Sequence, residues 1–198
     1  RPTLFGQYLG NYVFSRYGTK PGDMYFHVPE LDAYRSAIEA RAVGQPLILF
    51  ETRGGFLLRT FAPDRSAFEG RVLERVGRIG KRLVFVFSGE HLLALHLMRA
   101  GRLHWGRANA PLPGRGGLGA LRFPSGTVFI TEAGRKRRAS VHLFDALGAL
   151  SHLDAGGVEP LEVSEEAFGV RLRERNQTLK RALTHPAVVA GVGNAYSD

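Results

Sequence analysis

The chain has 198 residues, 44% of them hydrophobic, so it can bury a core as one large domain or two small ones. Its 27 Lys and Arg outnumber 18 Asp and Glu, and the net charge of +9 favours nucleic acid as a partner, with an anionic membrane second. The absence of Cys excludes disulfides and thiolate-bound zinc, and no membrane span or secretion signal is apparent, so we expect a cytoplasmic protein.

The first predicted element is a helix. Residues 1–23 show neither helical nor strand periodicity, so we treat them as an N-terminal extension and expect Met24 to be the natural start. From residue 30 to residue 42 apolar residues recur at helical spacing, and Pro29 is suited to a first helical turn. The apolar positions are Leu31, Tyr34, Ile38 and the alanines.

After this helix the sequence changes to short apolar runs broken by Gly, Pro and Asp, which is typical of a β-sandwich or barrel. The expected strands are residues 47–51, 55–61, 71–77, 82–87, 91–98, 102–105, 120–123, 127–131 and 138–144. The fully apolar runs Leu83–Phe87 and Leu92–Leu95 predict strands that are buried on both faces. The glycine-rich run Gly114–Gly119 lies between strands and predicts a loop.

Charged helical sequence replaces the strands between about residues 150 and 162. Ser164 can cap one helix that has Phe168 and Leu172 on its apolar face. Thr178 can cap a second, with Leu179, Ala182 and Leu183 facing inward, and a third begins near Asn194. We therefore divide the chain into the extension 1–23, a β-domain 24–152 and a helical domain 153–198.

Basic residues are densest at Arg135-Lys136-Arg137-Arg138, on a predicted hairpin where they could spread over phosphates. A solvated turn is the alternative interpretation. A weaker cluster, Arg75, Arg78, Lys81 and Arg82, flanks another strand start.

The end of the chain has the residue types of a phosphate-binding site. The glycines of Gly191-Val192-Gly193-Asn194 allow close approach to a backbone, and Asn194 adds a side-chain amide. Lys180 on the preceding helix could reach the same phosphate, although an ordinary Gly-rich turn and a solvated Lys are the alternatives. The seven His residues form no metalloprotease pair, and we interpret them mostly as structural.

Several short motifs occur in an order that carries more information than any of them alone. They are Pro29-Glu30-Leu31-Asp32, Gly80-Lys81, His96–Leu103 (HLMRAGRL), Arg137-Arg138, Gly157–Leu161 (GVEPL), Thr178-Leu179-Lys180 and Gly191–Asp198 (GVGNAYSD). In this order and spacing the chain resembles bacterial formamidopyrimidine-DNA glycosylases and their endonuclease VIII relatives, from residue 24 to residue 198.

The resemblance implies an α+β fold, in which a β-sandwich with an amphipathic helix is followed by a helix-two-turn-helix domain cut short at Asp198. It implies a base excision repair enzyme, a DNA N-glycosylase with AP lyase activity that binds damaged duplex DNA and excises oxidised bases. By motif position, Lys81, Lys180 and Asn194 would hold phosphates around the flipped nucleotide, and we count Lys81 among the candidate catalytic residues. Arg137, beside Arg138, would enter the duplex. We expect a monomer in the bacterial cytoplasm, associated with the nucleoid.

The resemblance places no metal or other cofactor in these residues, because the family's zinc finger would follow Asp198. Family chemistry uses an N-terminal Pro, whose amine attacks the sugar C1′, and the Glu that follows it as proton donor. The local motif makes Pro29 and Glu30 this pair, but the nitrogen of Pro29 is then an amide unless the chain is cut before it. The gapless register, which we favour because it keeps the helix continuous, places Phe26 and His27 at the catalytic positions.

Two other positions depart from the family pattern. Arg99 stands where many members have a Met that fills the gap left by the flipped base, and Ala139 stands where a Phe wedge is usual. Three hypotheses therefore remain: a DNA glycosylase/lyase, a catalytically defective DNA-binding member of the same fold, and a basic RNA-binding β-domain. The last requires aromatic residues on an exposed sheet face, whereas Phe85 and Phe87 lie in apolar runs.

Overall fold

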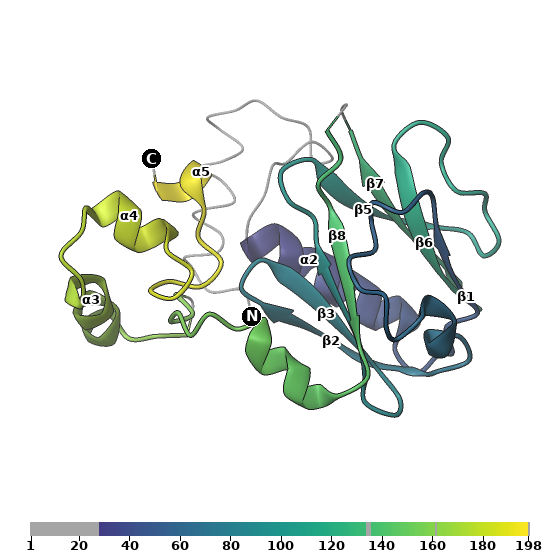
Figure 1. Ribbon diagram of the computed structural model, residues 1–198, viewed down its shortest axis with the longest axis horizontal. Coiled ribbons are helices and arrows are strands. Elements are labelled where there is room, and N and C mark those ends of the chain that lie inside the picture. Colours follow the sequence, from purple (N-terminus) through teal and green to yellow (C-terminus); the bar gives the residue numbers. More distant parts are fainter. Residues whose placement is uncertain (1–27, 134–135, 161, 198) are drawn as a thin grey trace.

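The computed structural model describes residues 28–133, 136–160 and 162–197. It has an α+β architecture, in which short helices near the C-terminus lie beside two antiparallel sheets (Figure 1). The predicted extension 1–23 lies outside the described residues.

Helix α2 (Val28–Ala42) is the predicted amphipathic helix. Leu31, Ile38 and Ala42 on its apolar face are buried in the main core, and Tyr34 packs against that core. Pro29 lies in the first turn, where a backbone N–H would have no carbonyl partner within the helix. The missing N–H of proline therefore costs no helical hydrogen bond. The helix packs chiefly on strand β2, so its first turns lie close to the end of that strand.

Two four-stranded sheets follow, and every pair of neighbouring strands in them is antiparallel. One sheet contains, in spatial order, β1 (Leu49–Thr52), β6 (Gly117–Phe123), β7 (Gly126–Glu132) and β5 (Gly101–Gly106). The other contains β2 (Leu73–Ile79), β3 (Arg82–Phe87), β4 (His91–His96) and β8 (Ser140–Phe144). The 3-10 helix η1 (Arg65–Phe68) follows β1.

The facing sides of the two sheets share one hydrophobic core, as expected for a β-sandwich. Phe50 and Ile130 enter it from one sheet, and Phe85 and Leu143 enter it from the other. The outer side of β3 and β4 is also buried, around Val84, Val86, Leu92 and Ala94. Phe144 and Leu153 pack against this second cluster, which confirms that both strands are buried on two faces.

Three expectations about the strands are wrong. Residues 55–61 form no strand. Leu58 makes only an isolated bridge to Val141. Beyond this bridge, Leu143 N–H donates its hydrogen bond to the Thr60 side-chain hydroxyl, so the backbone pairing does not continue. Strand β6 begins at Gly117 instead of residue 120, so the glycine-rich run is only partly a loop. A Cβ on Gly117 would lie 2.2 Å from the Pro113 carbonyl oxygen, so only glycine permits this close approach.

The third correction concerns the basic cluster. Strand β7 pairs with β5 and β6, whereas β8 pairs with β4 in the other sheet. The segment between them is therefore a crossover from one sheet to the other and not a hairpin. Arg135 lies outside the described residues, and Lys136, Arg137 and Arg138 are exposed.

The 3-10 helix η2 (Leu147–His152) leads to the helical segment, which we define as residues 164–197. It contains α3 (Glu165–Arg173), α4 (Leu179–Thr184) and α5 (Asn194–Ser197). The hydroxyls of Ser164 and Thr178 accept hydrogen bonds from Ala167 N–H and Arg181 N–H, which confirms both predicted caps.

A small separate core holds these helices together. Ala182, Val188 and Val189 are buried in it, and Phe168 and Leu172 pack against them. Leu179 was expected to face inward but is 63% exposed, because it occupies the first position of α4, before the buried side of the helix begins.

Candidate nucleic-acid interface

Strand register brings three connections to one end of the sandwich. Arg82 at the start of β3 pairs with His96 at the end of β4, and His96 pairs with Ser140 at the start of β8. In the other sheet Gly101 at the start of β5 pairs with Glu132 at the end of β7. Since only residues 97–100 separate β4 from β5, the β2–β3 turn, the β4–β5 turn and the basic crossover all emerge here.

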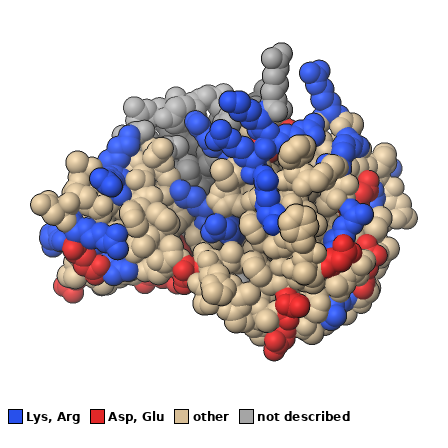
Figure 2. All heavy atoms as spheres, viewed as in Figure 1, with Lys and Arg blue, Asp and Glu red and all other residues tan. Residues whose placement is uncertain are grey.

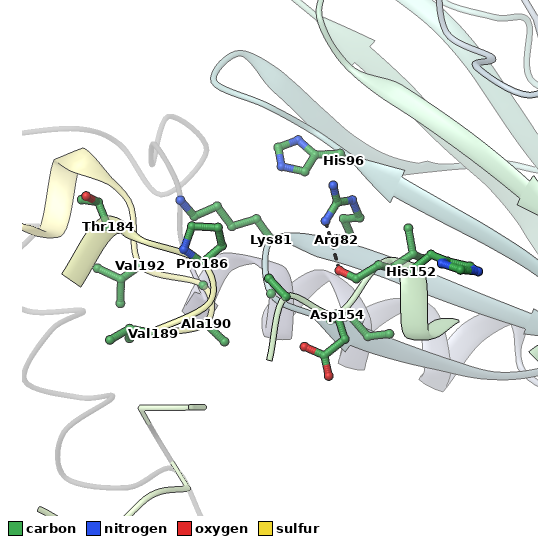
Figure 3. Close-up of a pocket in the computed structure, with 15 residues that line it drawn as sticks. Lys81, Arg82, His96, His152, Asp154, Thr184, Pro186, Val189, Ala190 and Val192 are labelled. Carbon is green, nitrogen blue, oxygen red and sulfur yellow. Dashed lines mark hydrogen bonds between the residues drawn. The ribbon is translucent and has the colours of Figure 1, made fainter. Parts of the chain in front are cut away.

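A cavity of about 370 Å³ lies between this end of the sandwich and the segment that joins α4 to α5. Lys81 and His96 line it from the sandwich, and Thr184 and Gly191 line it from the helical segment. Figure 3 shows the Lys81 side chain extending from the β2–β3 turn toward Pro186. The fold therefore brings together motifs that are about a hundred residues apart in the sequence.

Lys81 is a half-buried cation in this cavity. Burial lowers the pKa of its ammonium group below the usual value for Lys, because water stabilises the charged form less well there. An anion placed in the cavity would offset this loss of hydration. The sequence-based assignment of Lys81 to a functional site is therefore compatible with its position.

His96 is a cavity residue that the sequence interpretation left among the structural histidines. Burial, together with the positive charges of Arg82 and Lys81, lowers the pKa of His96 to about 4, so its ring is neutral at neutral pH. Its Nδ1 accepts a hydrogen bond from Met98 N–H at 3.1 Å, which places the ring proton on Nε2. The signal that could have found it is its place in the motif HLMRAGRL.

Helix α4 carries Lys180, which is exposed and lies one turn before the cavity residue Thr184. Asn194 is exposed at the first position of α5, just after the cavity residues Gly191 and Val192. Gly191 has φ +78°, a left-handed conformation that favours glycine and allows the sharp turn expected there. Neither Lys180 nor Asn194 lines the cavity itself, although each lies within four residues of one that does.

The segment between α4 and α5 is held in place by residues 157–160, which precede α3 and which we call the linker. Val158 N–H donates to the Val188 carbonyl, and Ala190 N–H donates to the Val158 carbonyl, in a short parallel bridge. A Cβ on Gly157 would lie 2.3 Å from the Pro186 carbonyl oxygen, which explains the glycine in GVEPL. This bridge fixes Gly191 relative to Glu159 in the linker.

Arg78 connects the linker to the sandwich. Its side chain is 10% exposed and forms ion pairs with Glu159 at 2.6 Å and with Asp32 of α2 at 3.4 Å. Within the cluster Arg75, Arg78, Lys81 and Arg82, Arg78 thus has a structural role, and Arg82 donates to the Leu153 carbonyl. Lys81 is the member of this cluster whose side chain extends toward the helical segment in Figure 3.

Lys and Arg side chains gather over the upper middle of the face shown in Figure 2, whereas Asp and Glu lie mostly toward its lower edge. Lys136, Arg137 and Arg138 are exposed on the crossover, and Arg99 is exposed on the adjacent β4–β5 turn. Several positive charges on one side of the protein are typical of a surface that binds a polyanion.

Two of the three candidate catalytic residues, Pro29 and Glu30, lie in the first turn of α2. Pro29 follows Val28 in the helix, so its nitrogen is part of a peptide bond. Glu30 accepts a hydrogen bond from the Tyr34 hydroxyl at 3.0 Å. Burial and the nearby Glu30 carboxylate raise the pKa of Tyr34 to about 12. Phe26 and His27, the pair in the alternative register, lie outside the described residues.

Ala139 stands where the resemblance places a wedge residue, and its side chain is 2% exposed. It packs in the main core, so it cannot enter a duplex. Exposed side chains at this end of the sandwich include the cationic Arg99, Arg137 and Arg138 and the apolar Met98.

Among the described residues, no group of three or more His, Asp or Glu side chains is placed to hold a metal ion. No helix in the described part of the chain has the length and apolar character needed to cross a membrane.

Comparisons with known proteins agree with this arrangement. Residues 27–139 match the family model described as the formamidopyrimidine-DNA glycosylase N-terminal domain. The formamidopyrimidine-DNA glycosylase of Lactococcus lactis subsp. cremoris is 26% identical over 175 residues, and that of Roseiflexus sp. (strain RS-1) is 32% identical over 180 residues. Each alignment covers 86% of this chain and 64% of the relative, so the chain spans less than two thirds of their length.

Solved structures share the fold. A complex between the Lactococcus lactis Fpg and DNA containing an abasic site superposes with a TM-score of 0.76 at 24% identity, over 87% of this chain and 65% of that chain. A complex of its G226P mutant with Fapy-dG-containing DNA gives the same TM-score and identity, over 87% of this chain and 64% of that chain. Because the family model covers more than half of the residues, the chain belongs to the formamidopyrimidine-DNA glycosylase family.

Proposed function

We propose that this chain is part of a DNA repair glycosylase with AP lyase activity, which binds damaged duplex DNA and excises oxidised bases. The observation that carries the proposal is the cavity between the sandwich and the helical segment, where Lys81, His96 and the Gly191 turn meet. Its place in a family of DNA glycosylases makes nucleic acid the anion that fits.

Each proposed role follows from the position of the side chain. Lys81 supplies a positive charge in the cavity, and the neutral His96 supplies an Nε2–H donor, which together suit one phosphate group. The exposed Lys180 and Asn194, each within four residues of a cavity residue, contact the neighbouring phosphates. Arg137 and Arg138 reach the duplex from the crossover. Backbone contacts of this kind offset the few kcal/mol needed to flip a nucleotide out of the stack.

We also propose the finer organisation of the chain. Residues 24–152 are the sandwich domain of the glycosylase, and residues 153–198 are part of a helix-two-turn-helix domain. The two capped helices α3 and α4 with their own core support this assignment, as does the glycine turn before α5.

Salt-dependent binding tests the phosphate contacts. The probe is a labelled duplex with a tetrahydrofuran abasic analogue, and fluorescence anisotropy gives its affinity at several salt concentrations. We expect Lys81→Ala and Lys180→Ala each to reduce the slope of log K against log salt by about one, because each removes one phosphate contact. Arg107→Ala is the matched control, since this exposed arginine follows β5 at the opposite end of the sandwich.

Unchanged slopes in both lysine variants would contradict the proposal. Binding of single-stranded RNA as tight as that of the duplex at matched salt would favour an RNA-binding protein instead. The structure does not support that alternative, because Phe85 and Phe87 are fully buried and no exposed sheet face presents them for base stacking.

A second candidate function is duplex DNA binding without catalysis, and the position of Pro29 favours it. The nitrogen of Pro29 is a peptide nitrogen within α2, so it cannot form a Schiff base in the intact chain. Sodium borohydride reduces the imine between an enzyme amine and an abasic site to a stable bond. A covalent adduct on abasic duplex, located by mass spectrometry, is expected for a lyase. Tight binding with no adduct at any protein concentration would establish the non-catalytic alternative.

A further inference from the structure

Of the acidic residues that the structure describes, Glu132 is the buried one, and only 3% of its surface is exposed. It ends β7, where its carboxylate Oε2 accepts hydrogen bonds from Arg138 N–H at 2.8 Å and from Ala139 N–H at 3.0 Å. A buried charge is unfavourable unless such donors surround it, and bonds to a charged acceptor are stronger than neutral ones. Glu132 is therefore a specific anchor for the last residues of the crossover.

The anchor itself is rigid. Strand β7 lies inside its sheet, and Glu132 is held on both sides, because its N–H donates to the Gly116 carbonyl at 2.8 Å and its Cα pairs with Gly101 of β5. Ala139 is fixed a second time by its buried side chain. The backbone of Arg138 is thus tied to the sheet, whereas the side chains of Arg137 and Arg138 are exposed.

We propose that Glu132 is a positioning residue of the DNA interface. Its carboxylate holds the crossover backbone in the conformation from which Arg137 and Arg138 reach the nucleic acid. A chain that is ordered before binding loses less conformational entropy when it binds. The inference rests on the proposed function, because Glu132 has this role only if Arg137 and Arg138 contact DNA. Glu132 itself touches no DNA in this arrangement.

A double-mutant cycle tests the proposal in the full-length protein. The probe is the tetrahydrofuran duplex, and the variants are Glu132→Ala, Arg137→Ala with Arg138→Ala, and the three changes together. We expect Glu132→Ala to weaken binding about tenfold and to lower the salt slope by about one, because the arginines lose their fixed approach to phosphates. Adding Glu132→Ala to the double-arginine variant should change affinity less than twofold.

Two further measurements separate positioning from general destabilisation. Glu132→Gln keeps an oxygen acceptor without the charge, so its bonds from the Arg138 and Ala139 N–H groups should be weaker. If Glu132→Ala does not fold, Glu132→Gln replaces it in the cycle and should weaken binding in the wild-type background but not in the double-arginine background. Ile130→Val on the same strand reaches the main core and is the matched control, which should lose stability without losing DNA affinity. Amide exchange at Arg138 and Ala139 should be faster in Glu132→Ala than in Ile130→Val.

The outcomes distinguish this inference from the proposed function. Additive effects in the cycle, or wild-type affinity and slope in a folded Glu132→Ala, would overturn the positioning role while leaving DNA binding intact. If the double-arginine, Lys81→Ala and Lys180→Ala variants all bound DNA like the wild type, the proposed interface itself would be wrong.

Discussion

At the level of single residues, the site contains side chains whose pKa values are lowered by burial. Most Lys and His side chains are solvated, whereas those of Lys81 and His96 are partly buried. The positive charges of Arg82 and Lys81 lie near the neutral His96 ring. For both groups the lowered pKa reflects the loss of hydration of the charged form. A phosphate bound as proposed would offset this loss.

His96 should make stability depend on pH. Its folded pKa of about 4 lies below the usual 6.5, so the unfolded chain binds the proton more readily between these values. Stability from this group is therefore complete above pH 6.5 and is lost as the pH falls toward 4. We expect a loss of roughly 1–2 kcal/mol, reduced from a maximum of about 3 kcal/mol because the ring is partly open to solvent.

Urea unfolding of wild type and His96→Gln across this pH range measures the contribution. Gln does not titrate but can still accept the Met98 N–H, so the stability difference between the two proteins should change between pH 6.5 and pH 4. His104, whose pKa is also lowered, remains in both proteins, so its contribution cancels. A difference that does not vary with pH would contradict the assigned pKa.

At the scale of elements, local patterns predicted most of the helices and strands. The amphipathic helix α2, the doubly buried strands β3 and β4, and the caps at Ser164 and Thr178 follow from periodicity and side-chain chemistry within a few residues. Residues 55–61 were mistaken for a strand because their composition fits one. Their place at the sheet edge, where the Thr60 side chain replaces a backbone partner, depends on distant residues of β8.

The basic cluster illustrates the same limit. Two apolar strands separated by a short polar segment predict a hairpin, yet β7 and β8 belong to different sheets. Which strand pairs with which is decided by how both sheets cover the core, and no local pattern contains that information. The exposure of Lys136, Arg137 and Arg138 was predicted, whereas the anchor at Glu132 was not.

At the scale of the whole molecule, Arg78 connects α2, β2 and the linker to the helical segment. Arg78→Ala would leave the Glu159 carboxylate, whose side chain is 19% exposed, without its ion-pair partner, whereas Asp32 would keep its ion pair with Arg35. We expect a loss of about 2–4 kcal/mol in unfolding free energy, because removing one member of a buried pair strands the other charge. We also expect weaker binding of abasic duplex, since the cavity is formed from both sides of this connection.

Urea denaturation measures the stability, and the double variant Arg78→Met with Glu159→Gln is the control. It removes the unpaired charge on Glu159 and should recover part of the lost stability. A change below about 0.5 kcal/mol in Arg78→Ala, the range of ordinary surface substitutions, would show that the ion pairs are not important.

The sequence by itself determined the basic character of the chain, its division into strands followed by helices, and its family resemblance, because these depend on composition, on local periodicity and on the order of motifs. Lys81, Lys180, Asn194 and the Gly191 turn were also named from the sequence, whereas His96 appeared only within a motif and Thr184 and Glu132 were not singled out. The three-dimensional arrangement was needed to show that Lys81, His96 and the Gly191 turn line one cavity, and that Lys180 and Asn194 do not line it. Their proximity depends on strand register and on the Arg78–Glu159 connection, which join residues far apart in the chain.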